Sequence, residues 1–223
     1  MDEYSSEKEQ IEEIKKWWKD NGAFIVTGLI VGFGALGGWK YWQAYKEQRA
    51  ATASAHYEEL TIALGRGDTN GANELLGRLA DEFAATPYAA TGALAMAKYY
   101  AINDKPELAG EQLRGVIDNT KDEYLALVAR TRLARLMLAQ DQPDEALQLL
   151  AVSDPGSFTA RFHEVRGDAY AALGRHDDAR IEYLSALNQF EQGLVDREFI
   201  EMKLNDLGRT SAGAGSEPAD PDA

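Results

Sequence analysis

Residues 21–39 read NGAFIVTGLIVGFGALGGW and contain no charged side chain. As an α-helix with a rise of about 1.5 Å per residue, this stretch is about 28 Å long, close to the roughly 30 Å hydrocarbon core of a bilayer. Aromatic residues, which favour the headgroup level of a membrane, flank it on both sides. They are Trp17, Trp18, Trp39, Tyr41 and Trp42. The sequence therefore predicts a transmembrane helix over residues 21–42 with interfacial aromatic residues at both ends.

Three other interpretations of this stretch fit less well. A buried helix of a soluble protein gives no reason to confine all four Trp of the chain to its two ends. A cleavable signal peptide needs a basic leader and a cleavage site just after the apolar run, whereas the leader here is rich in Glu. Residues 32–37, GFGALG, match the dinucleotide-binding GxGxxG, but that motif follows a strand and a tight turn. Here apolar residues continue on both sides.

Glycines within the span are spaced in pairs of i and i+4, Gly28 with Gly32 and Gly34 with Gly38. Such pairs form flat surfaces where the backbone of a second helix can approach closely. One hypothesis is that a pair packs against a membrane partner or a second copy of the chain. The alternative, that glycine is simply tolerated in membrane helices, stays open.

Residues 1–20 form the predicted cytoplasmic leader. Ser6 and Glu9 have the spacing of a capping box, and apolar residues share one face of the turns that follow, so we expect a short amphipathic helix ending at Asn21-Gly22. Four lysines precede the span and three basic residues follow it. This bias orients the chain only weakly, with the N-terminus in the cytoplasm.

The acidic charge of the chain lies after the span. The whole sequence has 23 Lys and Arg against 37 Asp and Glu, a net charge of −14, while residues 1–50 hold 7 basic and 8 acidic residues. The net negative charge disfavours binding to the phosphates of DNA or RNA. The absence of Cys excludes disulfides, Cys-ligated zinc and thiol nucleophiles.

Residues 50–207 have apolar side chains at helical spacing, so this region is predicted to be all-α. Turn-forming residues divide it into helices of about 12–16 residues, as in stacked helical hairpins. The predicted breaks are 65–71, 86–87, 103–106, 119–122, 141–143, 153–156 and 174–178. An alanine near the start of every second helix recurs at intervals of 37, 37 and 33 residues, at Ala72, Ala109, Ala146 and Ala179. This period predicts three to four repeated units.

The last unit resembles a tetratricopeptide repeat. The residues that carry this resemblance are Gly167, Tyr170, Gly174, Ala179, Tyr183 and Ala186. It departs from the family at His163, where Trp is frequent, and at Glu191, where Pro is frequent. The resemblance implies an α-solenoid, which we expect residues 194–207 to cap and a disordered tail of residues 208–223 to follow.

In tetratricopeptide arrays the first helix of each hairpin lines a concave groove. The resemblance places six residues of this chain there as candidate partner contacts: Leu94, Lys98, Thr131, Arg135, Leu138 and Asp168. Catalytic patterns are not found, since the three His are scattered and no HExxH, GxSxG or phosphate-loop motif occurs. We expect no catalytic residue, no metal and no cofactor, and a protein that is not an enzyme.

Several segments together resemble the YfgM family, an ancillary subunit of the bacterial SecYEG translocon. They are residues 15–18 (KKWW), 21–22 (NG), 37–42 (GGWKYW) and 201–207 (EMKLNDL). The resemblance covers residues 1–207. It implies a single-pass inner-membrane protein with its repeat domain, residues 43–207, in the periplasm. Its implied partners are SecYEG and PpiD, a membrane-anchored periplasmic protein of the prolyl-isomerase type.

The role implied by this resemblance is a scaffold or adaptor that passes emerging chains to periplasmic chaperones. A different class of function also stays open at this point. In that alternative, the chain is a regulatory membrane protein whose acidic leader acts on a cytoplasmic factor.

Overall fold

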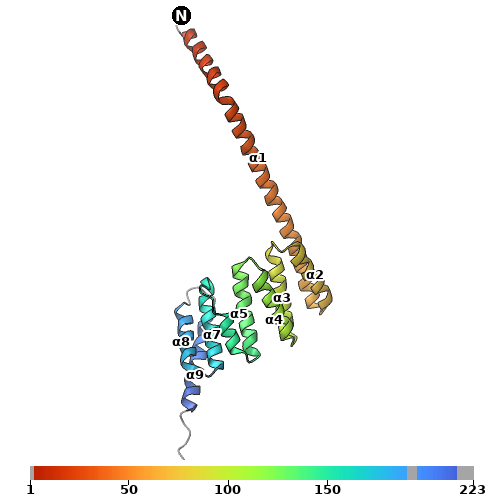
Figure 1. Cartoon of the computed structure of the whole chain (residues 1–223), viewed down its shortest axis with the longest axis vertical. Helices are drawn as coiled ribbons and strands as arrows, with labels where there is room; N and C mark the ends of the chain where they lie inside the picture. The colour runs from red at the N-terminus through yellow and green to blue at the C-terminus, as the bar shows by residue number, and fades with distance from the viewer. Residues whose placement is uncertain (1–2, 190–194, 215–223) are drawn as a thin grey trace, which may run out of the picture. The chain divides into compact units, whose positions relative to one another are not determined.

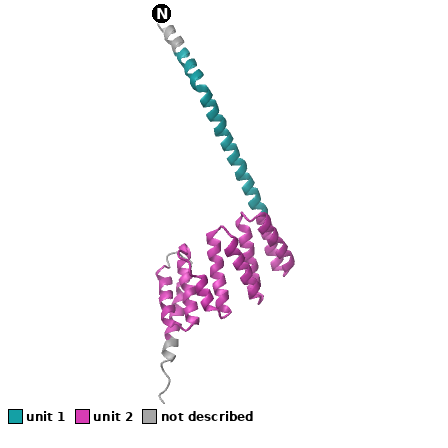
Figure 2. Cartoon of the chain, viewed as in Figure 1, with its two compact units in different colours: residues 1–52 teal, residues 53–223 magenta. Residues whose placement is uncertain are grey.

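The computed structural model describes residues 3–189 and 195–214, with side chains for residues 10–189 and 195–208. The chain divides into two compact units, Met1–Thr52 and Ala53–Ala223 (Figure 2). In the described residues every regular element is helical, which confirms the predicted all-α class.

In the first unit the chain is one uninterrupted helix, α1 (Glu3–Gly65), which continues into the second unit. The predicted helix end at Asn21-Gly22 is wrong. The Asn21 side chain donates a hydrogen bond to the Trp17 carbonyl at 3.0 Å and so stabilises the turn it was expected to end. A single Gly in a helix costs only about 1 kcal/mol, and the neighbouring residues outweigh it.

The repeat domain was predicted to start at residue 43, but the compact unit starts at Ala53. Residues 43–52 are helical and largely exposed. Ala53 and Leu60 are fully buried. The last turns of α1 therefore serve as the first helix of the domain.

In the described residues the domain consists of four helical hairpins and a final helix (Figure 1). The seven predicted breaks within the domain are confirmed. The hairpins are α1 with α2 (Thr69–Glu82), α3 (Pro87–Ile102) with α4 (Pro106–Asn119), α5 (Glu123–Ala139) with α6 (Pro143–Leu149), and α7 (Thr159–Ala172) with α8 (His176–Asn188). The short 3₁₀ helix η1 (Gly156–Phe158) precedes α7, and α9 (Arg197–Ala214) follows α8.

The turn inside each hairpin contains a residue in the left-handed region, with a positive φ. These residues are Gly67 at 75°, Asp104 at 53°, Asp141 at 59° and Gly174 at 71°. Each lies five positions before one of the four alanines of the predicted period. All four alanines are fully buried, so the small residue lets the two helices of the hairpin approach closely. The structure thus settles the number of hairpins at four in the described residues.

The last hairpin contains a close approach that requires glycine. A Cβ on Gly167 would lie 2.5 Å from the ring of Tyr183, closer than carbon atoms can pack. Tyr183 is itself buried, and its hydroxyl donates to Asp168 at 2.8 Å. Two of the residues that carry the tetratricopeptide resemblance therefore act as a packed pair between α7 and α8.

The helix α9 packs against the last hairpin, where the sequence predicts a capping helix over residues 194–207. Val195, Ile200 and Leu207 are buried against the last hairpin, whereas Phe199 and Met202 are about half exposed. The helix also continues to Ala214, so residues 208–214 are helical where the sequence predicted a disordered tail. Residues 208–214 contain no proline, the residue that most strongly stops a helix. Residues 215–223 of the predicted tail lie outside the described part of the chain.

Candidate functional site

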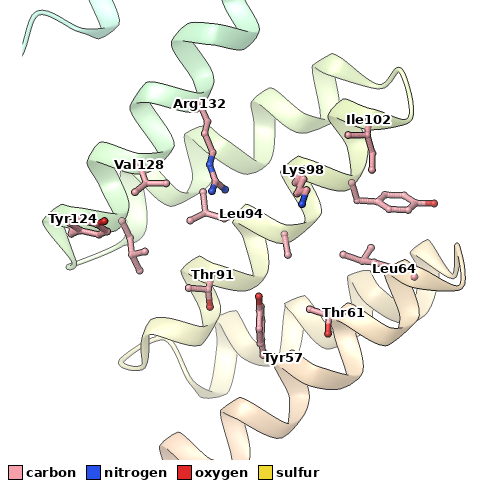
Figure 3. Close-up of a pocket in the computed structure, with 14 residues that line it drawn as sticks. Tyr57, Thr61, Leu64, Thr91, Leu94, Lys98, Ile102, Tyr124, Val128 and Arg132 are labelled. Atoms are coloured by element: carbon pink, nitrogen blue, oxygen red, sulfur yellow. The ribbon is translucent and has the colours of Figure 1, made fainter. Parts of the chain in front are cut away.

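A groove of about 710 Å³ opens between the last turns of α1 and the helices α3 and α5 (Figure 3). We call the side of the domain that is lined by the first helices of the hairpins its inner face. Most of its lining is apolar or aromatic. The lining residues are Tyr57, Thr61, Leu64, Gly65, Thr91, Leu94, Ala95, Lys98, Tyr99, Ile102, Tyr124, Leu125, Val128 and Arg132. We call this set the basic section of the inner face, because its only charged members are cations.

Apolar side chains in the basic section are open to solvent. Ile102 is 71% exposed and Tyr124 is 54% exposed, although the Tyr124 ring also packs edge-on against Phe158 with centroids 4.9 Å apart. The Tyr57 ring packs against the Tyr88 ring in a tilted arrangement, with centroids 6.0 Å apart. Rings held on one side and free on the other provide rigid apolar contacts at small entropic cost.

The two cations, Lys98 of α3 and Arg132 of α5, are exposed in the groove. Neither forms an ion pair or a side-chain hydrogen bond with another described residue. None of the described residues that line the groove is acidic, although the chain as a whole carries a net charge of −14. The sign of the charge here is thus opposite to that of the domain.

The inner face of α7 has the opposite character, and we call Glu164 and Asp168 its acidic section. The carboxylate of Glu164, which is only 2% exposed, accepts from Arg135 at 3.2 Å, Arg161 at 3.1 Å and Lys203 at 3.1 Å. Asp168 accepts from Lys203 at 2.8 Å as well. Lys203 belongs to α9, so the chain itself supplies the cation that fills its acidic section.

Tyr183 lies beneath the acidic section. Burial, followed by the charge and the hydrogen bond of Asp168 and the charge of Glu164, raises the pKa of Tyr183 above its ordinary value. The phenol therefore stays neutral and donates a hydrogen bond to Asp168. The acidic section is a structural ion-pair network in which each described carboxylate already has partners.

The first unit contains the one helix in the described residues that is long and apolar enough to cross a membrane. The aromatic residues predicted at the interfaces, Trp17, Trp18, Trp39, Tyr41 and Trp42, are all exposed. Lys46 lies 4.3 Å from the centre of the Trp42 ring. At Gly28, Gly32, Gly34 and Gly38 an added Cβ would meet no atom within 4 Å, so the backbone is accessible at each.

Comparison with known proteins covers both units. The sequence profile of the tetratricopeptide repeat-like domain family matches residues 15–209, which include the apolar helix. The ancillary SecYEG translocon subunit of Escherichia coli K12 is 30% identical over 210 residues, covering 93% of this chain and 99% of that protein. The proteins of the same name from Haemophilus influenzae and Neisseria gonorrhoeae are 30% and 29% identical, covering 92% and 93% of this chain. This chain belongs to the ancillary SecYEG translocon subunit family.

Family membership confirms the resemblance drawn from the sequence, while the six groove candidates are sorted by the structure alone. Leu94 and Lys98 line the basic section. Arg135, Leu138 and Asp168 line a second pocket of about 690 Å³ beside Lys203. Thr131 is buried, and its hydroxyl donates to the Leu127 carbonyl at 2.8 Å, so we remove it from the candidate contacts.

The sequence missed the residue next to Thr131. Arg132 lines the groove, four positions after Val128 and eight after Tyr124, so in the basic section α5 presents the residue one position after the predicted Thr131. Spacing of i and i+4 along α5 could have found this set. Tyr57, Thr61 and Leu64 were missed because the candidates were sought only between residues 94 and 168.

Proposed function

We propose that this protein is a non-enzymatic, single-pass adaptor of the Sec translocon. Its N-terminus lies in the bacterial cytoplasm, α1 crosses the inner membrane near residues 21–42, and the repeat domain lies in the periplasm. The observation that carries the proposal is the match to ancillary SecYEG translocon subunits along nearly the whole chain, apolar helix included.

The geometry supports an adaptor that binds protein segments in its inner face. A groove lined with apolar side chains and two cations that have no described ionic partner fits a binding surface, whereas the two buried carboxylates of the described residues, Glu164 and Glu182, are held in ion pairs. Glu182, for example, accepts from His163 and Arg166. The groove of the inner face therefore supports binding rather than catalysis.

A membrane anchor gives this binding its physical advantage. Tethering confines the domain to the membrane surface, which raises the effective concentration of partners that share that surface. Moderate groove contacts then suffice for capture and still allow release. In this proposal the partners are SecYEG through the span, and PpiD and emerging chains through the domain, with transfer to periplasmic chaperones as the outcome.

Site-directed photo-crosslinking in intact membranes tests the proposal. We expect a photoreactive residue at Gly28 or Gly34 to crosslink to SecYEG, and one at Ile102 in the groove to crosslink to a periplasmic protein. Ile181 of α8 is 62% exposed outside both sections of the inner face and is the matched control. Crosslinks from Ile181 as strong as those from Ile102 would contradict a role for the groove.

Orientation and the alternative regulatory function need separate measurements. Protease added to intact spheroplasts should digest the repeat domain and leave the leader protected. Deleting residues 1–14 should leave the Ile102 crosslinks unchanged, because the adaptor works through its domain. Loss of a cytoplasmic output with unchanged crosslinks would favour the regulatory alternative instead.

A further inference from the structure

The acidic section shows what kind of group the inner face accepts. Lys203 is only 14% exposed and lies between Glu164 and Asp168, with the Phe199 ring 4.5 Å from its ammonium group. The occupant of this section is thus a helix that presents an opposite charge next to an apolar ring. Charge complementarity thus acts on α9 together with the apolar contacts of Ile200 and Leu207.

The basic section is built in the same way but with the charges reversed. Lys98 and Arg132 take the place of the carboxylates, and Tyr99, Ile102 and Tyr124 supply apolar contacts. In the described residues no acidic side chain plays the part that Lys203 plays for α7. The like charges of Lys98 on α3 and Arg132 on α5 repel each other across the groove. An anion bound there would offset that repulsion.

The order of residues along α3 and α5 indicates how an occupant continues on both sides of its charge. Ile102 follows Lys98 by four positions on α3, and the half-buried Val128 precedes Arg132 by four positions on α5, so apolar side chains flank the two cations in both directions (Figure 3). A chain that ended at the cations would leave one of these contacts unused. This favours the carboxylate of an internal Asp or Glu over a C-terminal carboxylate.

We propose that the basic section binds a segment of a partner protein in which an acidic residue lies between apolar ones. Lys98 and Arg132 determine the preference for the acidic residue, and Ile102 and Tyr124 determine the overall affinity. This inference rests on the proposed function, in which the inner face is a surface for partner segments.

Peptide binding to the full-length protein in detergent micelles tests the inference, with fluorescence anisotropy as the measurement. The probes are short acetylated and amidated peptides with Phe and Leu flanking a central pair of Glu, Gln or Lys. We expect the Glu peptide to bind about tenfold more tightly than the Gln peptide and the Lys peptide to bind most weakly. Raising the salt concentration should reduce the affinity of the Glu peptide alone.

Matched variants separate the two contributions. The double variant Lys98→Gln with Arg132→Gln should bind the Glu and Gln peptides equally. Arg180→Gln, which removes one positive charge from an exposed residue of α8, should keep the preference. Ile102→Ala should weaken all three peptides by a similar factor. Because Ile102 is 71% exposed, the domain should fold normally, and circular dichroism checks this.

Three results would overturn the inference: equal binding of the Glu and Gln peptides to the unaltered protein, a preserved preference in the double variant, or a requirement for a free C-terminal carboxylate. Concentration-dependent self-association that the double variant abolishes would also overturn it, because a second copy would then be the occupant. Crosslinking from Gly28 to SecYEG does not involve the groove, so its absence would count against the proposed function and not against the peptide preference.

Discussion

The acidic and basic sections of the inner face show how one repeat geometry can serve two purposes. In the acidic section, Glu164 is almost fully buried and Lys203 comes from within the chain. In the basic section, Lys98 and Arg132 are exposed, and no described carboxylate pairs with them. A filled section adds stability, and an open one provides a place for a partner. The following predictions break or sharpen this comparison.

The largest effect is expected where the acidic section rests on the packing of α7 against α8. In Gly167→Ala the new Cβ would lie 2.5 Å from the Tyr183 ring, and the helices would have to separate. We expect a loss of about 3 kcal/mol of unfolding free energy, measured by denaturant titration. In the control Gly115→Ala the new Cβ meets no atom within 4 Å, so stability should rise by about 0.5–1 kcal/mol. Equal effects of the two substitutions would contradict the close approach.

The second prediction compares a lysine in each section. Lys203→Met should lower the unfolding free energy by about 2 kcal/mol, because Glu164 and Asp168 lose a charged partner while the methylene contacts persist. Lys98→Met should change stability by less than about 0.5 kcal/mol, since the ammonium group is exposed and unpaired. Thermal unfolding of both variants followed by circular dichroism provides the measurement. A destabilised Lys98→Met would mean that the basic section is also structural.

The third prediction concerns pH. The pKa of Tyr183 is raised in the folded state, so the folded protein holds this proton more tightly than the unfolded chain does. The stabilisation is complete below about pH 10, the pKa in the unfolded chain, and is lost at up to about 1.4 kcal/mol per unit as pH rises further. Tyr183→Phe should be less stable at neutral pH and lose stability less steeply above about pH 10. Parallel pH profiles for the two proteins would contradict the role given to this phenol.

The smallest effect is expected at Thr131, which the sequence placed in the groove. Thr131→Val removes a hydroxyl that bonds only to the carbonyl of the preceding turn, so stability should change by less than about 1 kcal/mol. Binding of the Glu peptide should be unchanged, in contrast to Arg132→Gln at the next position. An altered affinity in Thr131→Val would return this residue to the surface of the groove.

Much of the architecture followed from local patterns. The uncharged run at residues 21–39, the turn residues between helices and the recurring alanines were sufficient to predict the apolar helix, the breaks and the period. These features act over one turn or one hairpin, where propensity and helical periodicity are informative. The turns at Asp104 and Asp141 were also predicted as breaks, although Asp takes the left-handed conformation less often than Gly does.

The inner face was only partly predictable. Lys98 was identified, but Arg132 was missed by one position, and the role of Lys203 could not be inferred, because its partners Glu164 and Asp168 lie 39 and 35 residues earlier in the sequence. Asp168 lines the second pocket of the inner face, yet its carboxylate is already paired with Lys203 of α9. Repeat offsets can place a residue on the groove, but they do not show whether another helix covers that residue.

The sequence by itself determined the apolar helix, the helical repeat and the family, since each depends on the composition and spacing of neighbouring residues. Only the tertiary structure decided that the inner face divides into a section filled by α9 and a section left open. The physical reason is that ion pairing depends on distance in space, and the packing of α9 on α7 brings together charges that the linear sequence keeps far apart.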